Sequence, residues 1–173
     1  MTPSLVLPDL TLSDLAGTPT SLRALSPNGP LVVVFAANHC KYVSNIEAEL
    51  GQVANEYARR GVTVVAICSS DAGTYPEDTI AGLTAQAARA GWEFPYLLDP
   101  EQRAVDAFDA ACTPDIFVFT GGAELAYRGA FDASTPGNGA VVDGAELRRA
   151  LDLVLEGAPV PPSSVRMIGC SIR

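Results

Sequence analysis

One cysteine of this sequence stands between the two rarest basic residues. Cys40 follows His39, the only histidine, and precedes Lys41, the only lysine, while every other basic residue is an arginine. The thiolate is the nucleophilic form of cysteine, and positive charge nearby favours it over the thiol. This setting therefore indicates reactive sulfur chemistry at Cys40, with His39 and Lys41 expected to stabilise the thiolate.

The pattern around Cys40 predicts where the chain places it. Residues 31–35 and 62–68 are short, apolar and rich in β-branched side chains, which is typical of strands buried on both faces. Between them, apolar residues recur at helical spacing: Val43, Ile46, Leu50, Val53, Ala54 and Tyr57. A strand, a helix and a second strand form a βαβ unit. Cys40 is thus expected at the helix start, where unpaired N–H groups and the helix dipole also favour a thiolate.

The rest of the chain alternates in the same way. We expect a β-hairpin before residue 30, a helix within 76–91 with Ile80, Leu83 and Ala87 on its apolar side and Gly91 at its end, and an extended segment at 94–98. A helix should follow Asp99, strands should cover 116–119 and 125–128, and Asp143 should cap a last helix. These patterns predict an α/β fold with a mixed central sheet flanked by helices and an N-terminal β-hairpin extension.

Length and composition are consistent with one domain over residues 1–173, with the Pro-rich residues 158–173 as a C-terminal arm. The net charge is −9, and this sign argues against nucleic acid or an anionic membrane as a partner. No secretory signal is visible at the start, and the longest apolar run, 31–37, is too short to span a bilayer. We therefore expect a cytoplasmic protein in which the four cysteines are thiols rather than a disulfide scaffold.

Several short motifs together resemble the AhpC/TSA-type, peroxiredoxin-like redoxins of the thioredoxin family. They are Asn38-His39-Cys40-Lys41-Tyr42-Val43, Tyr75-Pro76-Glu77-Asp78, Phe94-Pro95-Tyr96-Leu97, Ala111-Cys112-Thr113-Pro114-Asp115, Tyr127-Arg128-Gly129, Pro136-Gly137-Asn138 and residues 168–173. The resemblance covers nearly the whole chain and implies a thioredoxin-like fold. It places Cys40 at the first position of the thioredoxin Cys-x-x-Cys motif.

The resemblance also implies a cis-proline at Pro114, in a loop that brings Thr113, and with it Cys112, over Cys40. The chain departs from the family at other positions. Val43 occupies the second cysteine position of Cys-x-x-Cys, so a disulfide cannot form within the motif. Ala37 and Val33 stand where a peroxiredoxin has its threonine and proline, which removes the hydroxyl that positions a peroxide.

A reactive cysteine needs a second thiol to complete an exchange. We favour Cys112 as the spatial neighbour of Cys40 and keep Cys170, carried by the arm, as a second candidate for the resolving cysteine. The leading hypothesis is a thiol–disulfide oxidoreductase or antioxidant redoxin that acts without a cofactor. Its substrate would be a protein or small-molecule disulfide or a peroxide, and a thiol would reduce it. Cys68 ends an apolar strand and is expected in the core.

Two other hypotheses remain open. The missing second cysteine and the missing threonine favour a non-enzymatic thioredoxin-like adaptor. Less favoured is a soft-metal module in which His39, Cys40, Cys112 and Cys170 bind zinc or copper(I). Against it, adjacent His and Cys residues chelate poorly, and no cysteine pair has the usual spacing, so we expect no resident metal.

Overall fold

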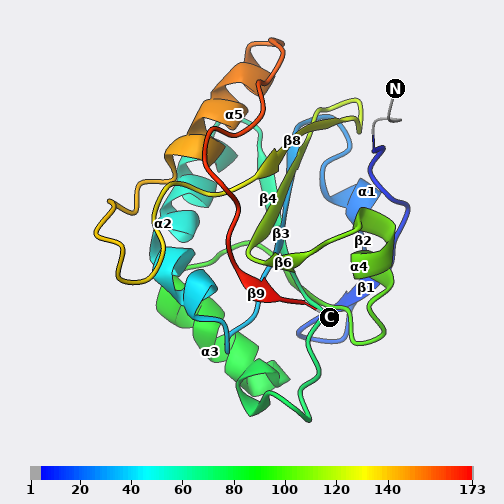
Figure 1. Cartoon of the computed structure of the whole chain (residues 1–173). Coiled ribbons are helices and arrows are strands. Elements are labelled where there is room, and N and C mark those ends of the chain that lie inside the picture. Colours follow the sequence, from blue (N-terminus) through cyan, green and yellow to red (C-terminus); the bar gives the residue numbers. More distant parts are fainter. Residues whose placement is uncertain (1–4, 173) are drawn as a thin grey trace.

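A seven-stranded mixed sheet forms the centre of the protein, with helices on both of its faces (Figure 1). The computed structural model describes residues 5–172. The strands of the sheet are β1 (Thr11–Asp14), β2 (Pro19–Ser21), β3 (Leu31–Phe35), β4 (Thr63–Cys68), β5 (Tyr96–Leu98), β7 (Asp115–Phe119) and β8 (Leu125–Gly129). Their order across the sheet is β2-β1-β5-β4-β3-β7-β8. A separate two-stranded sheet pairs β6 (Cys112–Thr113) with β9 (Cys170–Ser171).

The helices lie in two layers. They are α1 (Leu22–Leu25), α2 (Lys41–Ala58), the 3-10 helix η1 (Pro76–Asp78), α3 (Ile80–Ala90), α4 (Arg103–Phe108) and α5 (Ala145–Leu155). Helices α2, α3 and α5 cover one face of the sheet, and α1 and α4 cover the other (Figure 1). None of the helices within residues 5–172 combines the length and the apolar character that crossing a bilayer requires.

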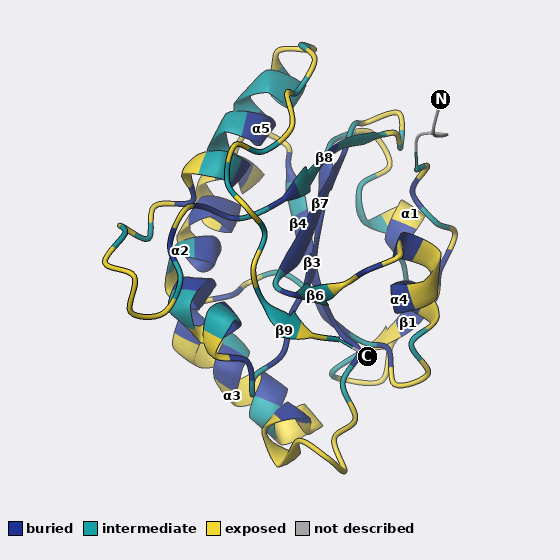
Figure 2. Cartoon of the chain, viewed as in Figure 1, coloured by how far each residue is buried: buried dark blue, intermediate teal, exposed yellow. Residues whose placement is uncertain are grey.

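Strand β3 is the middle of the core, and it leads directly to Cys40. Strand β4 pairs with it in parallel and β7 pairs with it antiparallel on the other side, and all five of its residues are buried because hydrophobic clusters cover both faces of the sheet. Figure 2 shows the central strands buried along their length. The predicted strand–helix–strand unit is confirmed, since α2 connects β3 to its parallel neighbour β4.

The N-terminal hairpin is also confirmed. Strands β1 and β2 pair antiparallel, and the carboxylate of Asp14 closes the turn by accepting from the N–H groups of Ala16 and Thr18. Gly17 has a φ of 83°, a conformation that glycine adopts without steric cost. The hairpin extends the sheet, because β1 pairs with β5.

Two local expectations hold only in part. The helix before Gly91 is confirmed, with Leu83 buried and Ala87 packed against the core, but Ile80 is 52% exposed because it is the first residue of α3. Asp143 precedes the N-cap of α5, but its carboxylate does accept from the N–H of Ala145, the first residue of the helix. Gly144 occupies the N-cap, with a φ of 64° that allows the chain to turn into the helix, while the Asp132 carboxylate accepts from the Gly144 N–H.

The C-terminal arm, residues 158–172, runs back across the sheet end and finishes beside β6, as the red ribbon of Figure 1 shows. Contacts hold it at both ends. Ser164 donates a hydrogen bond to Glu146 of α5, and Gln102 donates to the carbonyl oxygen of Ile172. No residue of 158–172 is fully buried, so the arm lies on the surface of the domain (Figure 2). The expected range 1–173 also includes residues 1–4 and 173, which lie outside the described residues.

We expect the aromatic cluster on the α4 side to dominate stability. Phe108 is 2% exposed and packs edge-on against Phe35, Phe117 and Phe119, so Phe108→Ala should lower the free energy of unfolding by about 3–5 kcal/mol. The matched control is Ile80→Ala on the exposed side of α3, where we expect a change within about 0.5 kcal/mol. Urea denaturation of both variants measures the difference, and equal losses would contradict this account.

Candidate active site

Cys40 occupies the N-cap of α2, as the sequence pattern predicts. Its backbone is extended, with a φ of −87° and a ψ of 118°, and its carbonyl oxygen accepts from the N–H of Ser44. The side chain is fully buried. Its sulfur lies 2.9 Å from the sulfur of Cys170 and 3.3 Å from the carbonyl oxygen of Thr113. As a thiol it donates to this carbonyl, and as a thiolate it accepts from the thiol of Cys170.

Cys170, rather than Cys112, is the neighbour of Cys40. In the β6–β9 ladder Thr113 pairs with Cys170, while Cys112 pairs with Ser171. Cross-strand partners point to the same face, and successive residues alternate. Cys112 therefore faces away from the side on which Cys170 meets Cys40, and its sulfur lies 3.5 Å from the carbonyl oxygen of Pro114. The expectation that favoured Cys112 is wrong on this point.

The approach of the arm to this strand depends on Gly169. A Cβ atom at this position would collide with the carbonyl oxygen of Thr113 and would lie 3.2 Å from the sulfur of Cys112. Only glycine leaves room for the two backbones to come this close. Gly169 therefore sets the position of Cys170, the next residue.

The strand before Pro114 is itself well anchored. The peptide bond between Thr113 and Pro114 is cis, as the family resemblance implies. The buried Asp115 carboxylate accepts from the N–H of Ala111 and pairs at 2.8 Å with Arg128 of β8. Arg128 also donates to the carbonyl oxygen of Asp109. These contacts fix both ends of the segment whose carbonyl oxygen meets Cys40.

The thiols differ in how readily they ionise. Burial and the charge of Asp115 raise the pKa of Cys112 to about 12. Burial, the hydrogen bond to Cys40 and the electrostatic interaction with it raise the pKa of Cys170 to about 11. The Lys41 ammonium and the backbone N–H of Tyr42 oppose this rise. The positive charge at the start of α2 thus acts on Cys170, and a role of Lys41 in stabilising the thiolate of Cys40 stays a prediction.

His39 is held by groups other than the sulfurs. Its Nδ1 lies 2.5 Å from the carboxylate of Asp78, and its ring stacks on Tyr75 with centroids 3.7 Å apart. Stabilisation of a Cys40 thiolate by His39 also remains a prediction. Within residues 5–172, no three His, Cys, Asp or Glu side chains converge to hold a metal ion. His39 faces Asp78 instead of joining the cysteines.

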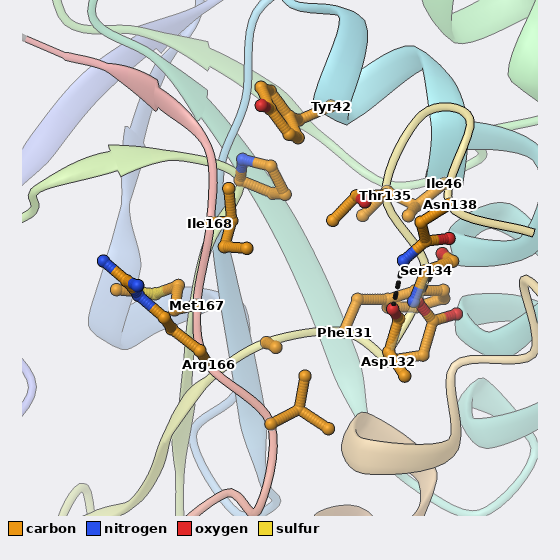
Figure 3. A pocket seen from close by; sticks show the side chains of 14 residues that line it. Tyr42, Ile46, Phe131, Asp132, Ser134, Thr135, Asn138, Arg166, Met167 and Ile168 are labelled. Atoms are coloured by element: carbon orange, nitrogen blue, oxygen red, sulfur yellow. Dashed lines mark hydrogen bonds between the residues drawn. The ribbon is translucent and has the colours of Figure 1, made fainter. Parts of the chain in front are cut away.

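A cavity of about 160 Å³ lies under the arm, beside Pro114. We call it the Tyr42 cavity. Figure 3 shows the arm with Met167 and Ile168 on one side and the loop with Ser134 and Asn138 on the other. The arm spans this space without filling it, so the segment before Cys170 is incompletely packed.

Comparison with known proteins adds to this geometry. The model of the AhpC/TSA family matches residues 4–131. The chain belongs to the AhpC/TSA family. No curated protein matches the chain. The structure of a peroxidoxin, BcpB from Mycobacterium tuberculosis, is similar with a TM-score of 0.67 and 19% sequence identity. The match covers 91% of this chain and 97% of that one, and at this identity it shows only that the two proteins share a fold.

Two solved structures are similar over almost the whole length. A hypothetical protein from Sinorhizobium meliloti 1021 shares 40% identity with a TM-score of 0.94, and the match covers 99% of this chain and 94% of that one. An uncharacterised conserved protein from Geobacillus kaustophilus shares 40% identity with a TM-score of 0.93, and the match covers 100% and 93%. The predicted thioredoxin-like fold and the AhpC/TSA resemblance are therefore confirmed.

This AhpC/TSA chain departs from the family motifs in ways the structure explains. Val43 is fully buried on the core side of α2, so the second position of the motif serves packing. Ala37 is 1% exposed and carries no hydroxyl. Cys68 is buried in β4, as predicted, and burial raises its pKa. Of the four cysteines, only Cys40 and Cys170 have sulfurs in contact with each other.

Sequence reasoning missed two residues of the site. Asp78 stands in a quoted motif, but nothing in the sequence shows that its carboxylate reaches His39, 39 positions earlier in the chain. Gly169 precedes Cys170 in a Pro-rich tail. A glycine at such a position is a signal that the backbone there approaches another backbone closely.

We expect Cys112 to be poorly reactive in the folded protein. Because its pKa is raised to about 12, it stays protonated at neutral pH, where the thiol is not the attacking form. Iodoacetamide labelling near pH 8, followed by mass mapping, should modify Cys112 more slowly than a free cysteine peptide. Urea-unfolded protein is the control, and labelling of folded Cys112 at the peptide's rate would contradict the prediction.

Proposed function

We propose that this AhpC/TSA protein is a thiol–disulfide oxidoreductase in which Cys40 is the nucleophile and Cys170 is the resolving cysteine. The observation that carries the proposal is the 2.9 Å contact between their sulfurs. A disulfide bond is about 2.05 Å long, so the two atoms need to approach by less than about 1 Å. The contact also makes the second step intramolecular, with the rate advantage of an oriented pair.

The proposed reaction has two steps. The thiolate of Cys40 attacks a substrate disulfide, so a bond forms between Cys40 and one substrate sulfur while the other leaves as a thiolate and is protonated. Cys170 then loses its proton and attacks the sulfur of Cys40, which releases the second substrate thiol. Overall the two cysteines lose two electrons and two protons to the substrate, and an external thiol reduces the Cys40–Cys170 disulfide.

The assignment of the two roles follows from the surroundings of each sulfur. Cys170 has a pKa raised to about 11, so it keeps its proton at neutral pH, and its sulfur lies 2.9 Å from that of Cys40. Cys40 stands at the N-cap of an 18-residue helix, whose dipole favours negative charge at that end, while the backbone N–H of Tyr42 bonds to Cys170. Cys40 is therefore the first attacker, and Cys170 acts once Cys40 is oxidised.

The arm controls access in this proposal. Cys40 is fully buried, so a substrate reaches it only after β9 leaves β6. Opening of the arm breaks few contacts, because the β6–β9 ladder joins only two residues on each strand and no residue of 158–172 is fully buried. The Tyr42 cavity under the arm further reduces the contact that opening removes.

A non-enzymatic adaptor is the second candidate. Two observations favour it: Cys40 is closed off by the arm, and Val43 and Ala37 lack the groups that a thioredoxin or a peroxiredoxin uses. An adaptor need not oxidise its cysteines, so formation of a disulfide separates the two functions.

Treatment with a small disulfide should produce an intramolecular Cys40–Cys170 bond, seen by intact mass and peptide mapping. Cys170→Ser should stop at a mixed disulfide on Cys40, because no second thiol touches it. The matched control Cys112→Ser should bridge at the wild-type rate. A Cys40–Cys112 bond, or no bridge in the wild type, would refute the assignment.

Gly169→Ala should displace the arm, because its Cβ collides with Thr113. We expect several-fold faster alkylation of Cys40 and slower formation of the Cys40–Cys170 bond. Gly122→Ala is the matched control, since Gly122 lies in the turn between β7 and β8 and the nearest atom to its added Cβ is Oγ1 of Thr120, 3.7 Å away. Unchanged rates in Gly169→Ala would show that this close approach does not hold the arm.

A further inference from the structure

The ring of His39 is fixed in position and orientation. The Asp78 carboxylate holds Nδ1, and the ring of Tyr75 stacks on it with only 9° between the planes. The side chain of His39 remains 17% exposed, whereas that of Asp78 is fully buried. An imidazole held on one edge and one face has little rotational freedom, which is unusual for a residue whose only task is to contribute charge.

Asp78 also determines which nitrogen is available. Its carboxylate accepts from the N–H groups of Asn38 and His39, from the hydroxyl of Ser70 and from Nδ1 of His39. A carboxylate only accepts, so Nδ1 carries a hydrogen. Nε2 has no hydrogen-bond partner within residues 5–172. It is therefore the nitrogen that can exchange a proton with another molecule.

The ring of His39 lines a cavity of about 200 Å³, the His39 cavity. Its walls include Thr113, whose carbonyl oxygen contacts Cys40, and Ser171, which follows Cys170. Much of the remaining lining is polar: Ser69, Ser70, Asp71, Thr74, Tyr75 and Gln102. Ser171 moves when β9 opens to admit a substrate, whereas His39, Ser70 and Thr113 lie outside the arm. These walls stay in place and leave room near Cys40 for a small released group.

We propose that the His39 cavity receives the leaving group of the substrate and that Nε2 of His39 protonates it. The inference rests on the proposed function and adds the substrate class. The substrate is a small molecule whose leaving group departs as a strong base, such as an alkyl thiolate. His39 is the catalytic acid, and Asp78 and Tyr75 are positioning residues.

The proton balance of this step is simple. The Cys40 thiolate forms a bond to one sulfur of R–S–S–R, the S–S bond breaks, and R–S⁻ leaves with the bonding electron pair. Nε2–H of the imidazolium gives its proton to R–S⁻, which departs as R–SH. The neutral imidazole then regains, through solvent, the proton that Cys40 lost on becoming a thiolate. General acid assistance of this kind contributes most when the leaving group is a poor one.

The pH response has a defined set of contributors. The titratable groups that contact His39 or line its cavity are Asp78 of η1, Tyr75 before it and Asp71, while Cys40 and Lys41 follow His39 in the chain. Hydrogen bonds from Thr74 and Gly73 lower the pKa of Asp71, so it stays ionised at neutral pH. His39 is the only histidine, and imidazole is the side chain that ordinarily titrates between pH 5 and 8.

Two disulfides of different leaving group test the proposal. Hydroxyethyl disulfide releases a basic alkyl thiolate, while dithiobis-nitrobenzoate releases a thiolate that needs no proton. His39→Gln should slow the first on the order of 100-fold and leave the second within about twofold, each compared with wild type on the same substrate. The pH dependence of the alkyl disulfide rate should change in the variant, while that of the aromatic disulfide rate should not.

A second variant distinguishes loss of the proton donor from a folding defect. In His39→Ala the added space should admit free imidazole, which should restore the alkyl disulfide rate but leave the aromatic one unchanged. Equal slowing of both disulfides, or no rescue, would overturn the role of His39 while leaving Cys40 as nucleophile. If the wild type reacts with neither disulfide and behaves like Cys40→Ser, the proposed function itself fails.

Discussion

The contact between the sulfurs of Cys40 and Cys170 depends on two backbones that touch at Gly169 and Thr113. The carbonyl oxygen of Thr113 meets Gly169 on one side and the sulfur of Cys40 on the other. The other parts of the site position the residues of this contact. Cys40 follows strand β3, the Asp115–Arg128 pair fixes the segment that contains Thr113, and the arm contains Cys170.

Charge is distributed around this point in a way that the net charge of −9 conceals. Lys41 and the Tyr42 N–H oppose the rise in the pKa of Cys170 that burial and Cys40 cause. His39, which sequence proximity would assign to the thiolate, is paired with a buried carboxylate. The two basic residues beside Cys40 therefore act on different partners, one on the second sulfur and one on the cavity beside the pair.

Local patterns predicted most of the fold. The spacing of apolar residues within a short stretch of sequence predicts strands β3 and β4 and helix α2. It also predicts the place of Cys40 at the start of that helix. The choice between Cys112 and Cys170 could not be made this way. Which cysteine faces Cys40 depends on the register of a two-residue ladder between segments about 60 positions apart. A shift of this register by one residue would turn each side chain to the opposite face. The pairing of His39 with Asp78 is likewise a contact between distant segments.

The complete burial of Cys40 has a kinetic consequence. In the proposed function any reagent reaches Cys40 through the same opening of the arm, so its observed rate is its intrinsic rate multiplied by the fraction of molecules that are open. Reagents of very different reactivity are therefore slowed by the same factor. At high reagent concentration the rate reaches a plateau equal to the opening rate. Alkylation of one thiol thus reports both the equilibrium and the speed of a motion in the arm.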